Sequence, residues 1–247
     1  MIAIVATLVS LLIPSLGSAR ALSQSAACGA RLQQLGVATS MYLDDHRNAL
    51  PQMRGPQPGG GTAIVGTLFG GKKGRLPLFG VDSIGPERRP LNAYTRQSAV
   101  PSDSEDVAFE MEEFRSPVDH GAEELYLPLP EYSRTESIYH LLGTSYVVND
   151  HSLDGESSRT LVPEAGGPMP MVADPSKTWM LGSHTIYNFQ QDSDRGERWY
   201  SPQRVEANLL FVDTHARIRV PVPDVLCEVE NTTPNYTFFP VPERRRN

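Results

Sequence analysis

Three adjacent Asp-His pairs are the part of this sequence that comes nearest to a metal-binding pattern. They are Asp45-His46, Asp119-His120 and Asp150-His151. Adjacent side chains on a strand point to opposite faces of a sheet, so such a pair does not hold one ion with both residues. The sequence has no HExxH motif and no close pair of histidines that would complete a site. We therefore expect no metal and no other cofactor.

A phosphate-binding loop is the second chemistry to consider. The segment "AIVGTLFGGKKGRLP" satisfies GxxxxGK with Gly66, Gly71 and Lys72. A phosphate loop needs Ser or Thr at the next position and a helix that begins there. Lys73 occupies that position, and Pro77 opposes a helix. We expect a Gly-rich turn segment here and no nucleotide site.

Two further patterns also fall short of a site. The acidic stretch at 98–113, with Asp103, Glu105 and Asp106, lacks the alternating ligands and the Gly of an EF-hand loop, so we expect solvated charge and a short helix near 106–114. Ser145 in "GTSYV" lacks the second Gly of GxSxG. The sequence therefore predicts a protein that is not an enzyme.

The composition narrows the class of protein. The chain has 247 residues, enough for one sizeable core, and its net charge of −7 argues against nucleic acid as a general partner. The 20 glycines and 21 prolines favour a loop-rich β or α+β body. Cys28 and Cys227 form no CxxC pair. They make one bridge if the compartment is oxidising, or remain lone buried thiols, which are common.

The start of the chain is apolar, with no charge from Met1 to Ala19. Pro14 makes the run before it short for a bilayer, which needs about 20 residues. A secretory signal is the other reading, because "GSA" at 17–19 resembles a cleavage site, but the usual basic start is missing. The apolar positions expected to pack in this half are Ile4, Leu8, Leu11, Leu12, Pro14 and Leu16.

The residues that follow continue the same helix with one apolar face. Cys28, Leu32, Leu35, Thr39 and Tyr42 recur at steps of four and three, which is the helical period. This face is expected to dock on a folded body. The helix should end near 45–48, because Pro51 blocks continuation. Positions expected to stay in water are Arg20, Gln24, Arg31 and Gln34; positions that allow close approach of a neighbour are Gly29 and Gly36.

The rest of the chain predicts short strands between loops. A Gly- and Pro-rich loop is expected at 52–62, and a strand at 145–149. A turn at 174–176 precedes a strand at 178–182. A hairpin is expected from 207–212 and 216–220, with Asp213, Thr214 and His215 in its turn. Asp213 and His215 are the least poor metal candidates because they share this turn, although an Asp there usually supports the turn backbone.

Several of these segments, taken in order, resemble the type IV pilin-like proteins, and more closely their prepilin-type H-x(9)-D-G subfamily of planctomycete type. The motifs that carry the resemblance are the apolar helix with Pro14, Ala19-Arg20, Cys28, Leu32 to Gly36, Tyr42 and Leu50-Pro51. Later segments are "RPLNAY" after "GGK", "FRSPVD", "TSYVVN", "PSKTWMLG" and the hairpin "ANLLFVDTH", whose matching positions are Asn208, Leu210, Phe211, Asp213 and His215.

The chain departs from the subfamily pattern at named places. Ser116 stands where Cys is usual, so a family pairing with the helix cysteine would leave Cys28 without its partner. In the hairpin signature Gln203 replaces His and Thr214 replaces Gly, so the turn either avoids positive φ there or accepts strain. The family's basic leader, its Phe and its Glu are also missing from this sequence, which starts within the expected apolar helix.

The resemblance implies an α+β, pilin-like fold, with a stalk helix at 1–50 and a loop-rich antiparallel β head at 51–247. It implies a structural subunit of a type IV pilus-like or type II secretion pseudopilus-like filament in the cell envelope. The expected partners are copies of itself or related subunits, the inner membrane before assembly, and the assembly machinery. The alternative is a membrane-anchored envelope binding module for a glycan or protein that does not polymerise. A hydrolase or nucleotide-binding enzyme is the remaining rival.

Overall fold

The structure is a computed structural model, and it describes residues 2–102, 109–150, 160–163, 165–190, 193–224 and 233–241. For residues 2–18 and 21 it describes the helix but not the side chains. Several predictions therefore lie outside the described residues: the packing of Ile4, Leu8, Leu11, Leu12, Pro14 and Leu16, the acidic residues Asp103, Glu105 and Asp106, and the roles of His151 and Cys227.

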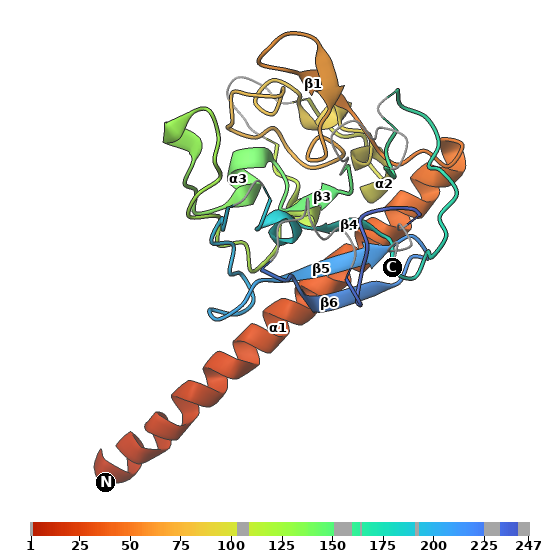
Figure 1. Cartoon of the computed structure of the whole chain (residues 1–247). Coiled ribbons are helices and arrows are strands. Elements are labelled where there is room, and N and C mark those ends of the chain that lie inside the picture. Colours follow the sequence, from red (N-terminus) through yellow and green to blue (C-terminus); the bar gives the residue numbers. More distant parts are fainter. Residues whose placement is uncertain are drawn as a thin grey trace.

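One long helix, α1 (Ile2–Asp45), begins the chain and continues through Pro14 as a single element. Its first half projects away from the folded body, whereas its second half lies against that body (Figure 1). The helix ends where the sequence predicts, in a turn at 46–48 in which Arg47 and Asn48 have positive φ. Among the described residues, no helix is both long enough and apolar enough to cross a bilayer.

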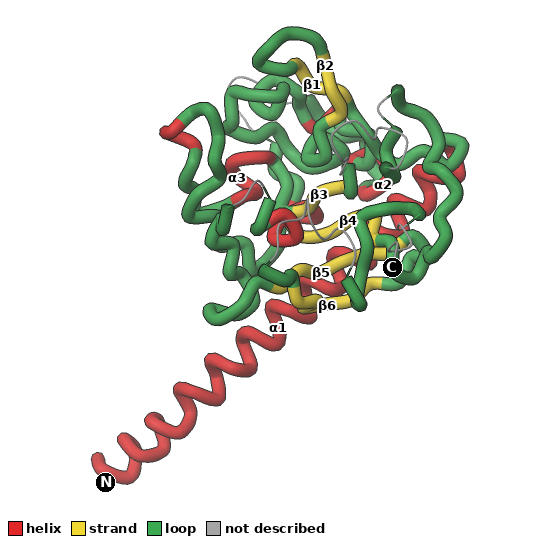
Figure 2. The backbone as a smooth tube through the Cα atoms, viewed as in Figure 1, coloured by secondary structure: helices red, strands yellow, loops and turns green. Residues whose placement is uncertain are grey.

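The folded body is built on a four-stranded antiparallel sheet in the order β3-β4-β5-β6. Each strand pairs with the next strand along the chain (Figure 2). The predicted strands at 145–149 and 178–182 and the predicted hairpin are all found. The strands are β3 (Tyr146–Val148), β4 (Trp179–Ser183), β5 (Glu206–Phe211) and β6 (Ala216–Pro221).

Several short helices lie within the loops of the body. They are η1 (Pro86–Arg88), α2 (Asn92–Thr95), η2 (Glu112–Phe114), η3 (Pro130–Tyr132), α3 (Ile138–Leu142) and η5 (His184–Tyr187). With one long helix and two antiparallel sheets, the chain is of the α+β class. Most of the body is loop, as the Gly and Pro content predicts.

Strands β3, β4 and β5 are buried at every position because a core lies on each face of the sheet, whereas β6 is largely exposed. Tyr146 and Val148 belong to the core beneath α1, whereas Val147 between them belongs to a second core on the opposite face. Leu210 and Leu209 divide in the same way, because successive strand residues point to opposite faces. The second core is completed by aromatic residues of the loops, including Tyr236.

The segment at 52–62, predicted as an irregular loop, contains a small second sheet. Its strands β1 (Arg54–Pro56) and β2 (Thr62–Ile64) pair antiparallel. The Arg54 side chain reaches across the pair and donates to the Thr62 hydroxyl at 3.1 Å and to the Thr62 carbonyl at 2.7 Å. The glycines predicted to break the structure form the tip of this hairpin, where Gly60 and Gly61 have positive φ.

In the second arm of the main hairpin the sequence alternates Arg217 and Arg219 with Ile218 and Val220, which predicts one wet and one dry face, and the structure departs from this pattern. Arg217, Ile218 and Arg219 are all exposed. The register shifts beside Asn208, and Arg219 adopts φ of 54°, so β6 carries a bulge. The Asn208 side-chain oxygen accepts from the displaced Arg219 N–H at 2.8 Å. A bulge resets the period of two, which sequence alternation alone does not reveal.

Candidate functional site

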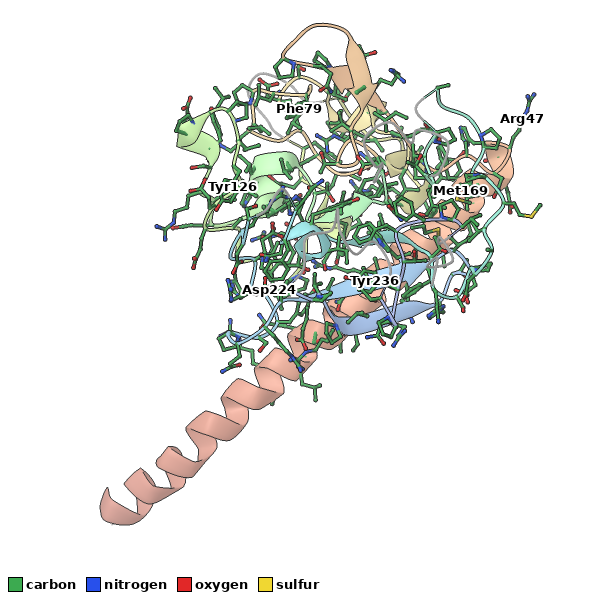
Figure 3. The ribbon with its side chains drawn as sticks, in the orientation of Figure 1. Arg47, Phe79, Tyr126, Met169, Asp224 and Tyr236 are labelled. Atoms are coloured by element: carbon green, nitrogen blue, oxygen red, sulfur yellow. The ribbon has the colours of Figure 1, made fainter. Side chains whose placement is uncertain are left out.

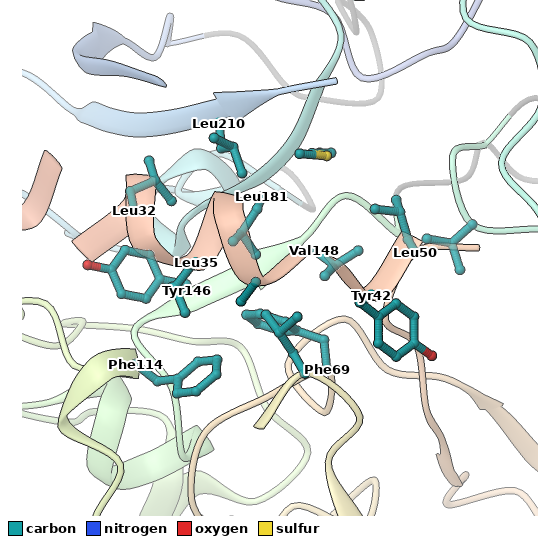
Figure 4. Packing of buried hydrophobic residues seen from close by; sticks show 14 of the residues in the cluster. Leu32, Leu35, Tyr42, Leu50, Phe69, Phe114, Tyr146, Val148, Leu181 and Leu210 are labelled. Atoms are coloured by element: carbon teal, nitrogen blue, oxygen red, sulfur yellow. The ribbon is translucent and has the colours of Figure 1, made fainter. Parts of the chain in front are cut away.

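The docked half of α1 is the first candidate site, because it joins the projecting helix to the head. Cys28, Leu32, Leu35 and Tyr42, the residues predicted to face the body, are all buried. Leu32, Leu35 and Tyr42 pack in one core with Val148 of β3, Leu181 of β4 and Leu210 of β5 (Figure 4). Thr39 is also buried, and its hydroxyl returns to the helix backbone at Leu35.

The two helix glycines lie where α1 comes closest to the hairpin. A Cβ on Gly36 would stand 2.9 Å from the Leu210 Cδ1, and a Cβ on Gly29 would stand 2.9 Å from the Ile218 Cγ2. Both distances are shorter than a normal carbon contact of about 3.5–4.0 Å. Glycine at these positions therefore lets α1 lie close against β5 and β6. The half-exposed Ile218 therefore lies against α1.

Cys28 faces Ser116 across this interface. The Cys28 Sγ lies 3.2 Å from the Ser116 Oγ, although 88 positions separate the two residues. This is the residue that stands where the resembling subfamily has Cys. Burial raises the pKa of the Cys28 thiol, with a smaller opposing contribution from the Ser116 hydrogen bond. Within the described part of the chain, Cys28 is a free cysteine.

Asp119, of the predicted "FRSPVD" turn, organises the backbone around Ser116. Its carboxylate accepts from the Ile138 N–H at 2.9 Å and the Tyr139 N–H at 2.7 Å, where α3 begins. It also accepts from the Ser145 hydroxyl at 2.7 Å, and Ser145 in turn accepts from the Ser116 N–H at 3.0 Å. Ser145 is fully buried in this network, so its hydroxyl has a structural role.

Two of the four helix residues expected to stay in water instead bind this same turn. The Gln24 side chain donates to the Pro117 carbonyl at 3.5 Å, and Arg31 donates to the Arg115 carbonyl. Arg20 and Gln34 are exposed as predicted. The turn at 115–117 lies beside α1, outside its buried face. The helical period predicts which face of the helix is buried, but it does not predict a neighbour at the edge of that face.

The signature hairpin keeps its predicted residues together at the tip of β5 and β6. The Asp213 carboxylate accepts from the His215 N–H at 3.3 Å and also contacts the His215 ring. That ring stacks on the buried Phe211 with centroids 4.4 Å apart. Asp213 therefore supports the turn backbone. Asn208 lies further along β5, where its side chain accepts from the backbone of the bulge at Arg219.

Thr214 resolves the question that its replacement of Gly raised, because it has φ of 71°. Positive φ is costly for a β-branched residue. We expect Thr214→Gly to raise the free energy of unfolding by about 1 kcal/mol, since relief of strain outweighs the extra freedom of glycine in the unfolded chain. Urea unfolding measures the change. Thr214→Ala, which keeps a Cβ, should gain less than half as much, and a loss of stability in Thr214→Gly would contradict the strain.

The apparent phosphate loop is held by protein groups. Lys72 donates to the Glu110 carboxylate at 2.6 Å and lies 4.8 Å from the centroid of the Tyr139 ring. The segment at 66–71 is a series of turns, and no helix begins at Lys73. Gly66 packs against the Asp150 carboxylate. This segment is therefore the predicted Gly-rich turn.

The residues that shape this turn come from the "RPLNAY" segment, whose role sequence reasoning did not identify. The Asn92 side chain accepts from the Gly71 N–H and donates to the Gly71 carbonyl, both at 2.7 Å. Tyr94 donates to the Asp45 carboxylate at 2.9 Å, at the end of α1. The buried Arg89 guanidinium donates to backbone carbonyls at Thr67, Gly70, Val81, Ile84 and Leu142. The one available signal was the order of "GGK" and "RPLN" in the resembling subfamily.

A cavity in the head is lined by polar residues from separate segments, of which the sequence analysis named only Asp150, as part of an Asp-His pair. It is lined by Asp150, His184 and Arg195, and Glu197 lies behind His184. These residues are widely separated in the sequence and fit no motif, so no pattern indicated that they meet. In the described residues, no group of three or more His, Cys, Asp or Glu is placed to hold a metal ion.

Comparison of the chain with protein-family models, with curated proteins and with solved structures finds no match.

Proposed function

We propose that the protein is a structural subunit of a pilus-like or pseudopilus-like filament, with an α+β head of pilin-like arrangement. The observation that supports this proposal is the division of α1 into a half that projects from the head and a half that docks on it (Figure 1). The sequence of the projecting half has no charge as far as Ala19.

The apolar projecting half drives association. In water, a helix that is apolar all round is unstable unless lipid or other helices cover it. The inner membrane covers it before assembly, and the same halves of neighbouring copies cover it in the filament. The filament then has a helical centre with the heads outside.

The exposed side of the docked half supports the same arrangement. Leu22, Val37 and Met41 are exposed by 72%, 65% and 52%. Their spacing keeps them on one side of the helix, away from the buried Leu32 and Leu35. A neighbouring copy's helix that follows the projecting half would cover this side too.

A second function fits the head: a membrane-anchored envelope module that binds a ligand and does not polymerise. The observation that favours it is the polar-lined cavity beside Asp150 and His184. The two functions differ in one measurable property, which is whether copies assemble.

Negative-stain microscopy of the purified full chain tests assembly. We expect filaments for the natural sequence, and discrete particles when Leu8→Arg and Leu12→Arg are combined, because two cations cannot be buried between helices. The unfolding midpoint of the head should change little, since these positions lie in the projecting half. Ser83→Arg, at an exposed position of the head, serves as the control and should still form filaments.

Discrete particles from the natural sequence, in detergent and after its removal, would contradict the filament proposal. They would favour the non-polymerising module. Filaments from the doubly substituted chain would instead show that the projecting half is not the assembly surface.

A further inference from the structure

A cavity of about 270 Å³ lies in the head, between the loops at 57–81, the end of β3 and the segment at 184–195. Phe79, in its wall, marks the region in Figure 3. None of the described residues that line the cavity belongs to α1. At about 30 Å³ per water, the volume corresponds to roughly nine waters, which is enough for one sugar-sized ring.

One wall carries a buried cation with an unused donor. Arg195 is 8% exposed, and its Nη2 donates to the Gln190 side chain at 3.2 Å. Its Nε has no hydrogen-bond partner in the described part of the protein. A buried donor without a partner is costly. This Nε has almost no exposed surface, so a ligand in the cavity would meet other atoms of Arg195, which is part of the lining.

Two other lining residues, His184 and Asp150, offer acceptors to a ligand, and Glu197 lies behind His184. Glu197 is fully buried, and both of its oxygens lie 2.9 Å from the His184 Nδ1. A carboxylate only accepts, so Nδ1 carries a proton, and in the neutral imidazole Nε2 is then an acceptor. The Asp150 carboxylate accepts from the Tyr187 hydroxyl at 3.2 Å. Burial raises the pKa of Asp150 to about 6, so the group is still mostly ionised at neutral pH.

The lining also includes the apolar side chains of Ile64, Leu76, Phe79 and Val81. A ligand must therefore offer carbon to these side chains, and both donors and acceptors to the polar ones. Arg195 is the only lysine or arginine among the described lining residues, and the carboxylates of Asp150 and Glu197 offset its charge, so a net negative ligand is disfavoured. Hydroxyl groups meet both demands, because each one donates and accepts.

We propose that this cavity binds a neutral polyhydroxylated molecule of the size of one sugar ring. One ligand hydroxyl accepts from the Arg195 side chain, and others donate to the Asp150 carboxylate and the His184 Nε2. The ring's carbon atoms contact the apolar side chains of the lining, such as Phe79. This site is independent of whether the chain forms filaments, because it lies in the head and uses no residue of α1.

Saturation-transfer difference NMR on the full chain tests the site with four probes at 10 mM: D-glucose, D-galactose, N-acetyl-D-glucosamine and myo-inositol. We expect signal from at least one of them, with ring protons receiving most of the transfer. At ten times its dissociation constant, the same probe should raise the unfolding midpoint by about 3 °C. L-Alanine and L-glutamate are the comparison probes, for a zwitterion and an anion.

Two substitutions assign the binding to this cavity. Asp150→Asn and Arg195→Gln should each raise the dissociation constant at least tenfold, with Gln34→Ala on α1 as the unaffected control. Circular dichroism checks that each variant is folded; if Arg195→Gln unfolds, Asp150→Asn decides. Absence of signal from all four polyols overturns the proposal. So does binding that neither variant weakens, or a response to the amino acids alone.

Discussion

Ser116→Cys is expected to form a disulfide with Cys28 and to raise the free energy of unfolding by about 4 kcal/mol under oxidising conditions. The two side-chain tips are already 3.2 Å apart, on segments separated by 88 positions. A bridge across so long a loop removes much of the freedom of the unfolded chain. It would also tie the docked half of α1 covalently to the head, at the position where the resembling subfamily has Cys.

The bridge is measured in a Cys227→Ser background, so that one pairing is possible. Thermal unfolding should show a midpoint about 12 °C higher in the oxidised protein than in the same protein with reductant. Because burial raises the pKa of the Cys28 thiol, oxidation should need a diamide or copper catalyst. The matched control combines Ser116→Cys with Cys28→Ser and should show no redox dependence. Two free thiols in the oxidised protein would contradict the placement of α1 on the 115–117 turn.

Arg89→Ala is expected to lower the free energy of unfolding by about 4 kcal/mol, and to lower the unfolding midpoint by about 12 °C. Arg89 is 1% exposed, and its guanidinium donates to five backbone carbonyls in three separate segments of the chain. Truncation leaves these buried acceptors without their donor and also leaves a cavity. Arg89→Lys should recover less than half of the loss, because one ammonium cannot reach acceptors spread around a planar fork.

The neighbouring residue supplies the control. Arg88 is exposed, so Arg88→Ala should change the free energy of unfolding by less than about 0.5 kcal/mol. Urea unfolding of the three variants makes the comparison. If Arg88→Ala and Arg89→Ala behave alike, Arg89 is not the residue that joins the loops.

Both experiments concern contacts that hold the head and the helix in one arrangement. Arg89 and Asn92 shape the turn at 66–71, and Tyr94 reaches the end of α1. Ser116 and Arg115 contact the middle of α1. Two segments that resemble the pilin-like subfamily, "RPLNAY" and "FRSPVD", therefore both contact the docked half of α1, which their scattered positions in the sequence did not indicate.

The sequence by itself determined the local elements. The sequence predicts the extent of α1 and its buried face, which includes Leu32, Leu35 and Tyr42. It also predicts the hairpin with Asp213 in its turn. Each follows from a period of 3.6 or 2 or from turn chemistry, which act between residues a few positions apart.

Only the tertiary structure decided what those elements touch. Cys28 meets Ser116, Arg89 meets five carbonyls, and Asp150, His184 and Arg195 gather round one cavity. The bulge at Arg219 belongs to the same group, because it puts Val220 in the second core although Ile218 lies against Gly29. These contacts join residues from distant segments, and their partners are mostly backbone groups that every residue carries. The physical reason is that side-chain periodicity records which face of an element is buried, whereas the packing of separate segments selects the atoms that it meets.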